Sequence, residues 1–558
     1  MTGRRVAAAA VLATAGTLIL FWLTSIPAGV PGEWVWERID AGPDILPDLL
    51  LGLTTAAVAG AAYLVLAWLG SRRLELAGRS ERAVWLITLA AAAFGWLSVL
   101  QETPPPPWGQ TRAAWVLYYP GPSGYFTRAR EITSVREFLA GYPALMAEGD
   151  VLHTGTHPPG LFLLHYGLLE LCRSDPGLTD LLHATEPASV AAGFDLIRNS
   201  SIQSGQTLHD AERAALWLAA LLTQASAAGT VLLLYLLLRQ TSLPPVACWR
   251  AVCFWPLIPA VGMFLPKSDV LYPLVGTLFL WLWWSGCRNR SGWRMSAAGL
   301  VMAVGMFLSL AMLPVALLGV LLAVGSLLVS PETDAGVLHE GDLNAKQPAD
   351  SSPLAPVVPW KSRWQTFLLL AGAAAAGWVL PLIGLAIWPG ISLPEIWLSN
   401  LQNHAGFYDQ FPRTWWKWLL VNPLELALAA GVPLFLLAVQ GAGQVLRNRS
   451  LRWSPAGIVA GCCLVTWCLL WLSSRNMGEA ARLWIFLLPW LVWVTGHSVL
   501  ATGPGGHSGS PNSGSPISGD ELSGNGLRST RRLWLLVLAC QAICCVGTAA
   551  RLTGFHFG

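Results

Sequence analysis

The stretch DLLLGLTTAAVAGAAYLVLAWLG, from Asp48 to Gly70, decides the fold class, because it carries no charge after its first residue. A helix of about 20 apolar residues crosses a hydrocarbon core of roughly 30 Å and satisfies its own backbone hydrogen bonds there. Comparable runs recur along the chain, so we predict an all-α polytopic membrane protein with about thirteen transmembrane helices. The spans are expected near 6–26, 48–70, 83–100, 214–238, 249–265, 269–286, 296–311, 313–330, 364–388, 418–440, 455–473, 483–500 and 533–551.

The composition agrees with this class. Of the 558 residues, 54% are hydrophobic and 12% are charged, whereas about a quarter of the residues in a soluble globular protein carry charge. The ten cysteines show no disulfide or zinc spacing. We therefore expect membrane lipids as the surroundings, and no nucleic-acid partner, cofactor or metal.

The basic residues predict the topology. With the N-terminus inside, the short cytoplasmic connections hold most of the arginines, as the positive-inside rule requires. This pattern predicts a multi-pass protein of the plasma (inner) membrane with its motifs on the external or periplasmic face. Arg4 and Arg5 before an apolar run also fit a signal peptide, but no clear small-x-small cleavage site follows them. The other arginines concerned are Arg72, Arg73, Arg79, Arg82, Arg239, Arg250, Arg288, Arg290, Arg294, Arg447, Arg449, Arg452, Arg528, Arg531 and Arg532.

Polar segments divide the chain into parts. Two of these segments are rich in Gly, Pro, Ser and acidic residues and are predicted to be disordered cytoplasmic linkers. The predicted parts are two N-terminal helices in 1–82, a membrane core in 83–500 that includes a linker at 331–363, a second linker at 501–532, and a last helix in 533–558.

The external insert at 101–212 is predicted to form amphipathic helices. From Phe126 to Met146, apolar side chains recur at helical spacing while charged ones fill the other side, which indicates an interfacial helix. The apolar run from Leu161 to Leu171 is too short to span a membrane, so we expect a second, partly embedded helix there.

The segment HTGTHPPG, from His153 to Gly160, is a candidate binding site. Its two prolines suit the first turn of a helix, where free N–H groups and a partial positive charge attract an anion. His153 and His157 are candidates to hydrogen-bond a phosphate or a sugar hydroxyl. A capped helix with a histidine at headgroup level accounts for the segment equally well. Gly155 and the prolines argue against a helical zinc site.

A late segment, SSRNMGEAAR, places Arg475, Glu479 and Arg482 at the mouth of a helix. Charges at a membrane rim are costly and are usually functional or paired. An arginine fork suits a phosphate, so we predict phosphate binding here, with an ion-pair network that fixes the helix end as the alternative.

Two further segments supply candidates for substrate binding. In NHAGFYDQFPRTWWKW, polar groups that include Arg413 lie beside aromatic rings, as in sugar sites, although an interfacial aromatic belt explains the segment as well. In PKSD, Lys267 is expected to be structural, and a local ion pair would account for its acidic neighbour. The candidates are His404, Tyr408, Asp409 and Asp269.

In their order and shared sidedness, these motifs resemble the GT-C class of membrane glycosyltransferases over residues 83–500. YF-x2-A-RE-I at 125–132, followed by HPPG, is similar to the external loop of protein O-mannosyltransferases, which carry HPPL, and of aminoarabinose transferase-like enzymes, which carry KPPL. Ser-Asp after Pro266 also matches, and Arg482 with Pro489 is similar to the family's Arg-Tyr…Pro. The resemblance implies a GT-C-like fold with its active site on the external face.

The chain departs from the family at the catalytic acid. The family carries an Asp-Glu pair a few residues before the tyrosine, whereas Tyr119 to Gly124 contains no carboxylate. A base must take the proton from the acceptor hydroxyl. The nearest substitutes are Asp150, Glu131 and Glu102.

Together these inferences predict an inverting glycosyltransferase. It would move a hexose or pentose from a polyprenyl-phosphate-linked donor to a lipid, glycan or protein acceptor in the envelope. The alternative is a non-catalytic lipid or solute carrier, which the absent Asp-Glu pair favours and the absence of an internal repeat disfavours. Both functions require the histidine–proline segment and the late arginine segment to meet in one pocket.

Overall fold

The computed structural model describes residues 3–40, 42–203, 207–328, 360–473, 476–498 and 522–555. Most of these residues are helical, and the strands within them are one short antiparallel pair, β1 (Gly29–Val30) with β2 (Trp34–Val35). Nine helices in the described residues are long and apolar enough to cross a membrane. The prediction of an all-α polytopic membrane protein is therefore confirmed.

These nine helices coincide with predicted spans, because length and hydropathy alone define them. They are α1 (Gly3–Leu18, continued to Leu23), α2 (Leu46–Arg73), α3 (Arg79–Gln101), α10 (Asp210–Arg239), α13 (Tyr272–Arg288), α15 (Leu313–Leu328), α17 (Trp360–Ile387), α22 (Pro455–Leu472) and α26 (Leu522–Ala549).

Two other predicted spans take a different form. The span at 418–440 consists of α19 (Trp415–Ala430) and α20 (Val432–Arg447), which meet at an angle of 107°. Between them Gly431 has a φ of +83°, a conformation that favours glycine. Helix α14 (Gly292–Leu308) is apolar but has only 17 residues. The count of thirteen crossings stays a prediction.

Prolines interrupt the two remaining predicted spans, 249–265 and 483–500. The prediction of one continuous helix is therefore wrong for both. Proline lacks a backbone N–H and clashes with the preceding turn, so it begins a helix more readily than it continues one. Pro256, Pro259 and Pro489 each stand at the start of a short helical piece. The helices formed are α11 (Pro245–Val252), α12 (Pro259–Met263), α23 (Ala480–Leu483) and α24 (Leu488–Thr495).

Neighbouring helices satisfy the carbonyls released by the first of these breaks. Tyr63 Oη, Trp96 Nε1 and Gln541 Nε2 donate hydrogen bonds of 2.9, 2.9 and 3.0 Å to backbone carbonyls of residues 253–257. Irregular backbone at membrane depth is tolerated only where protein or a water-filled cavity surrounds it. The broken segment is therefore part of the packed core.

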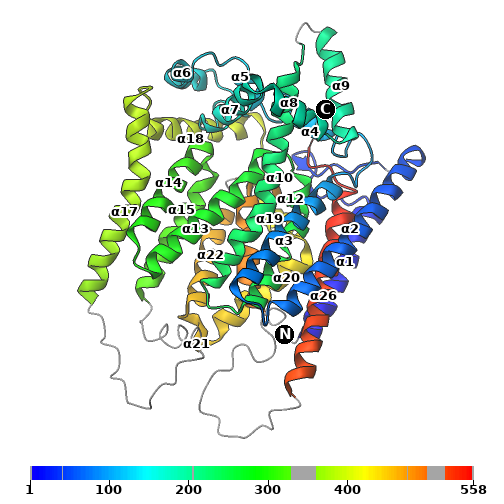
Figure 1. The fold of residues 1–558 in the computed structure, drawn as a ribbon, viewed down its shortest axis with the longest axis vertical. Coiled ribbons are helices and arrows are strands. Elements are labelled where there is room, and N and C mark those ends of the chain that lie inside the picture. The colour runs from blue at the N-terminus through cyan, green and yellow to red at the C-terminus, as the bar shows by residue number, and fades with distance from the viewer. Residues whose placement is uncertain are drawn as a thin grey trace.

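The insert forms short helices that gather at one end of the bundle, beside α18 (Leu393–Gln410) (Figure 1). The prediction of a single helix from Phe126 to Met146 is wrong, because a new helix starts after Ser134, whose hydroxyl accepts a 3.3 Å hydrogen bond from the Glu137 N–H. The predicted helix at 161–171 is present as α7. These helices are α4 (Arg112–Tyr118), α5 (Tyr125–Ala129), α6 (Val135–Ala147), α7 (Gly160–Ser174), α8 (Pro176–Ala184) and α9 (Ala188–Gln203).

The opposite end of the bundle carries the N-terminus and α21 (Arg449–Arg452) (Figure 1). Several long helices finish in arginine, namely α2, α10, α13 and α20. The motif-bearing segments and α21 thus lie at opposite ends of the molecule. Which face of which membrane each end meets stays a prediction.

Candidate functional site

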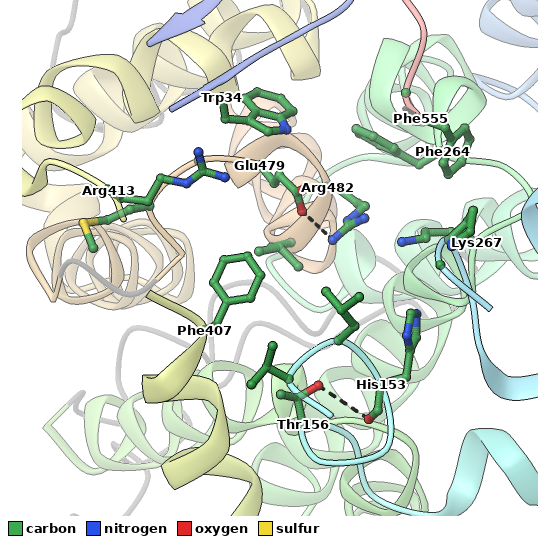
Figure 2. A pocket seen from close by; sticks show the side chains of 18 of the residues that line it. Trp34, His153, Thr156, Phe264, Lys267, Phe407, Arg413, Glu479, Arg482 and Phe555 are labelled. Carbon is green, nitrogen blue, oxygen red and sulfur yellow. Dashed lines mark hydrogen bonds and ion pairs between the residues drawn. The ribbon is translucent and has the colours of Figure 1, made fainter. Parts of the chain in front are cut away.

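A pocket of about 340 Å³ is lined by residues of the insert and of α18, among others (Figure 2). Segments far apart in the sequence form its wall, so the histidine–proline segment and the late arginine segment meet in one pocket. The lining residues include Trp34, Trp36, Glu37, His153, Thr156, His157, Phe264, Lys267, His404, Phe407, Tyr408, Arg413, Glu479, Arg482 and Phe555.

Asp150 shapes the loop that carries the histidines and does not line this pocket. Its carboxylate accepts hydrogen bonds of 2.7–3.3 Å from the backbone N–H groups of Leu152, His153 and Thr154. Burial raises the pKa of Asp150, but these backbone hydrogen bonds outweigh that effect and lower the pKa overall. A carboxylate stabilised in this way is a weak base, so its place in the structure is that of a loop cap.

Amide and hydroxyl donors hold the carbonyls of the same loop. Asn400 Nδ2 donates to the carbonyls of Gly155 at 2.8 Å and His157 at 3.1 Å. Asn403 Nδ2 also donates to Gly155, at 3.0 Å, and the Tyr142 hydroxyl donates to His157, at 2.7 Å. A Cβ on Gly155 would lie 2.3 Å from a backbone oxygen, so a larger residue does not fit without a shift. These contacts fix the direction of the loop's imidazoles.

The imidazoles of His153 and His157 are neutral at pH 7. Burial lowers the pKa of His153 to about 3 and that of His157 to about 4. The ring of Tyr125 packs edgewise against both imidazoles, with centroids 5.4 and 5.6 Å away, and Thr156 Oγ1 lies 3.1 Å from His157 Nδ1. A neutral imidazole donates one hydrogen bond and accepts another, which suits a sugar hydroxyl or a phosphate oxygen.

Arg482 and Glu479 form an ion pair in the pocket wall, with Nη2 and Oε2 2.5 Å apart (Figure 2). Asp269 Oδ2 lies 4.0 Å from Arg482 Nε and does not line the pocket. Burial lowers the pKa of Arg482, but these two carboxylates raise it by more, so the guanidinium stays charged. Arg475, predicted to join this cluster, lies outside the described residues.

Two more cations line the pocket, namely Lys267, which was expected to be structural, and Arg413, which belongs to the aromatic segment interpreted as a sugar site. Lys267 precedes α13, and burial lowers its pKa to about 8. Arg413 stands between α18 and α19, close enough to Glu479 for an electrostatic interaction. In the described part of the chain, the Nε atoms of Arg413 and Arg482 are buried and make no hydrogen bond.

Helix α18 contributes two of its three predicted residues. His404 and Tyr408, one turn apart, line the pocket, whereas Asp409 is exposed and does not. The Tyr408 hydroxyl accepts a 2.8 Å hydrogen bond from the Met477 N–H. This contact ties α18 to the turn that carries the late arginine.

Segments outside the predicted core complete the wall. Trp36 follows β2, and Phe555 follows α26. A backbone bridge between Arg38 and Leu552 holds the two segments together. No sequence pattern identified this wall as part of a binding site, because tryptophan is common beside membrane spans for other reasons. Both ends of the predicted domain division, 1–82 and 533–558, thus contribute to the pocket.

The other two predicted bases lie elsewhere. The side chain of Glu131 is 58% exposed and pairs with an arginine one turn away. Glu102 accepts a hydrogen bond from the Ser189 hydroxyl. Neither lines the pocket, whose carboxylates among the described residues are Glu37 and Glu479.

Groups of three or more His, Cys, Asp or Glu side chains able to hold a metal ion are absent from the described ranges. No protein-family model matches the chain, and no curated protein matches its sequence. The pocket itself is therefore the basis for assigning a function.

Proposed function

We propose that the protein is a membrane glycosyltransferase of the GT-C class, which transfers a sugar from a polyprenyl-phosphate-linked donor to an envelope acceptor on the external face. One observation carries the proposal: Lys267, Arg413 and Arg482 share a pocket with two neutral imidazoles and several aromatic rings. Arginine forks and an ammonium bind phosphate oxygens through charge-assisted hydrogen bonds. Phosphate is therefore the chemical group that best suits this set of donors.

Two arginine N–H donors without a hydrogen-bond acceptor support an anionic ligand. The Nε atoms of Arg413 and Arg482 are buried without a hydrogen-bond partner in the described residues, and leaving such groups unpaired costs free energy. Three cations line the pocket with two carboxylates, Glu37 and Glu479, and Asp269 lies behind the wall, 4.0 Å from Arg482 Nε. A phosphate would supply the missing acceptors.

The size and place of the pocket support a lipid-linked sugar. A volume of about 340 Å³ falls at the lower end of the range for small-molecule sites, roughly 300–1,000 Å³. The aromatic residues Trp34, Phe407 and Phe555 line the pocket (Figure 2), and aromatic rings are surfaces on which the C–H groups of a sugar pack. At the end of a transmembrane bundle, a donor could place its phosphate in the pocket while its tail stays in lipid.

The same groups would assist the reaction. As the bond between the anomeric carbon and the phosphate oxygen breaks, negative charge grows on the phosphate. Fixed charges such as those of Arg482 and Lys267 stabilise that charge most when they are already in place. The neutral His153 and His157 would orient the sugar without adding a charge of their own.

A non-catalytic carrier of a phosphate-bearing lipid is the second candidate. One observation favours it, because Asp150, Glu131 and Glu102 all lie away from the pocket. A carrier would bind the donor in the same way and release it unchanged.

Turnover distinguishes the two functions. The purified protein is incubated with polyprenyl-phosphate sugars and an envelope extract, and released polyprenyl phosphate is measured by mass spectrometry. Release at a rate above background is expected. Arg482→Ala should weaken donor binding by at least about thirtyfold, because truncating one partner of a buried charged pair costs about 2–5 kcal/mol. Arg173→Ala, which breaks an exposed ion pair on α7, should change nothing. Binding without turnover would exclude the enzyme, and no binding would exclude both functions.

A further inference from the structure

We propose that Glu479 is the general base of this reaction, an assignment that rests on the proposed function. Within the described residues, Glu37 and Glu479 are the carboxylates that line the pocket. Glu37 is exposed beyond β2, whereas the Glu479 side chain is only 27% exposed and lies among the cations (Figure 2). A base must come within about 3 Å of the proton that it removes, so it has to stand inside the pocket.

The backbone at Glu479 is held in an unusual conformation. Asn476, Gly478 and Glu479 have φ values of +63°, +79° and +55°. Left-handed backbone costs a residue other than glycine free energy, and it persists where the surroundings enforce it, often at functional sites. Two residues other than glycine, Asn476 and Glu479, adopt this conformation within four positions, where Glu479 enters the pocket.

Contacts from two helices enforce this turn. The Met477 N–H donates to the Tyr408 hydroxyl on α18 at 2.8 Å, and the Ala481 N–H donates to Glu425 Oε1 on α19 at 3.1 Å. A Cβ on Gly478 would lie 3.3 Å from an indole carbon on α19, a tight approach. Because both sides of the turn are anchored, the carboxylate is presented from a fixed platform, as a catalytic group requires.

The charged side chains are arranged along the pocket in an order that suits displacement of a phosphate from a sugar. Figure 2 shows Glu479 between Arg413 and Arg482, with Lys267 and His153 beyond Arg482. Electrostatic interactions link the same neighbours, from Arg413 to Glu479, from Arg482 to Lys267 and from Lys267 to His153. The cationic end at Arg482 and Lys267 takes the phosphate. Glu479 lies on the other side of Arg482 from Lys267 (Figure 2), so an acceptor hydroxyl beside it would approach the sugar from the side away from the phosphate.

The ion pair between Glu479 and Arg482 makes the base depend on the donor. A phosphate in the pocket competes for the guanidinium that now lies 2.5 Å from the Glu479 carboxylate. When Arg482 turns to the phosphate, the carboxylate loses that stabilising charge and becomes a stronger base. The donor therefore prepares the base before the acceptor reacts.

The step balances without a cofactor. The Glu479 carboxylate takes the proton of the acceptor hydroxyl while the hydroxyl oxygen bonds to the anomeric carbon, on the face opposite the phosphate. The bond from that carbon to the phosphate oxygen breaks, and its electron pair leaves with the polyprenyl phosphate. Protonated Glu479 then returns its proton to water.

Azide rescue tests this assignment, because azide is a nucleophile with no proton to lose. With a polyprenyl-phosphate sugar that the wild-type protein hydrolyses or transfers, Glu479→Gln should lower the rate by about a hundredfold or more. Sodium azide should restore release of polyprenyl phosphate and yield a glycosyl azide, while donor affinity should not fall, because the phosphate no longer competes with a carboxylate for Arg482. Glu170→Gln, which removes the carboxylate of another i,i+3 ion pair, 2.8 Å long and remote from the pocket, is the matched control and should behave as the wild type.

Other outcomes overturn the assignment. If Glu479 only holds Arg482 in place, Glu479→Gln weakens donor binding and azide restores nothing. A wild-type rate in Glu479→Gln places the base elsewhere. If that variant does not fold, Glu479→Asp, which keeps a carboxylate, is measured instead. It should retain more than a tenth of the wild-type rate without azide. A lower rate that azide does not raise refutes the assignment of Glu479 as the base. A wild-type protein that neither transfers nor hydrolyses any lipid-linked sugar refutes the proposed function and the base with it.

Discussion

Replacing Asn400 with alanine should loosen the loop that carries His153 and His157. Asn400 is fully buried on α18, and its amide donates to two carbonyls of that loop. Each of these carbonyls keeps a second donor, since Asn403 also serves Gly155 and Tyr142 also serves His157. The variant thus loses two hydrogen bonds without leaving a loop carbonyl bare. At about 1 kcal/mol for each hydrogen bond, the free energy needed to open the loop falls by about 2 kcal/mol.

The double variant Asn400→Ala, Tyr142→Phe should cost more than the sum of its parts. Tyr142→Phe alone removes one hydroxyl donor, worth about 1 kcal/mol. In the double variant the His157 carbonyl has lost both of the donors described above. An unsatisfied buried carbonyl costs a further 1–3 kcal/mol, so a coupling energy of at least about 0.5 kcal/mol is expected.

Hydrogen–deuterium exchange measures this loosening where it occurs. Amides in peptides that cover residues 150–157 should exchange roughly thirtyfold faster in Asn400→Ala, since about 1.4 kcal/mol corresponds to a factor of ten. Peptides from α8 and α9 serve as internal references and should not change. Unchanged exchange in the loop, or strictly additive effects in the double variant, would refute the claim that these side chains hold it.

Two further predictions concern stability. Thermal stability should fall between pH 7 and pH 5, because the pKa values of His153 and His157 are about 3 and about 4 in the folded protein and about 6.5 in the unfolded chain. The unfolded state therefore binds more protons as the pH falls through 6.5 towards 4, which lowers the free energy of unfolding by about 1–2 kcal/mol per histidine. His153→Gln should remove about half of this loss. A melting temperature that does not change with pH would contradict the burial of both rings. Gly155→Ala should destabilise the protein by about 1–3 kcal/mol, because its Cβ would lie 2.3 Å from a backbone oxygen. Gly141→Ala, which meets nothing within 4 Å in helix α6, should be neutral or stabilising, and equal melting temperatures for the two variants would argue against this packing.

The sequence predicted the membrane helices wherever length and hydropathy were sufficient. It failed where a proline or glycine interrupts an apolar run, as at Pro256, Pro489 and Gly431. Hydropathy averages such residues with their neighbours, whereas the backbone responds to each one singly. Whether the interrupted segment is tolerated depends on donors such as Gln541, nearly three hundred residues away in the sequence, which no local pattern identifies.

The candidate site, too, could be predicted only in part, because local patterns do not show which distant side chains meet. His153 and Arg482 belong to segments whose composition is unusual for a membrane protein, and both line the pocket. Asp150 stands three residues before His153, yet its carboxylate binds the N–H groups of its own loop, a local competition that sequence spacing does not resolve. Lys267 and Phe555 enter the pocket through packing between distant helices. Spacing therefore located the segments, and only tertiary structure assigned their side chains.

The wall formed by Phe555 has a consequence for how the protein matures. Polytopic chains are inserted into the membrane as they leave the ribosome, from the first helix to the last. Phe555 follows α26, and its neighbour Leu552 bridges back to Arg38, so this side of the pocket is missing until α26 has crossed. A nascent chain halted before that helix would expose the remaining lining to solvent. Competence to hold a ligand should thus arise only after α26 has been inserted.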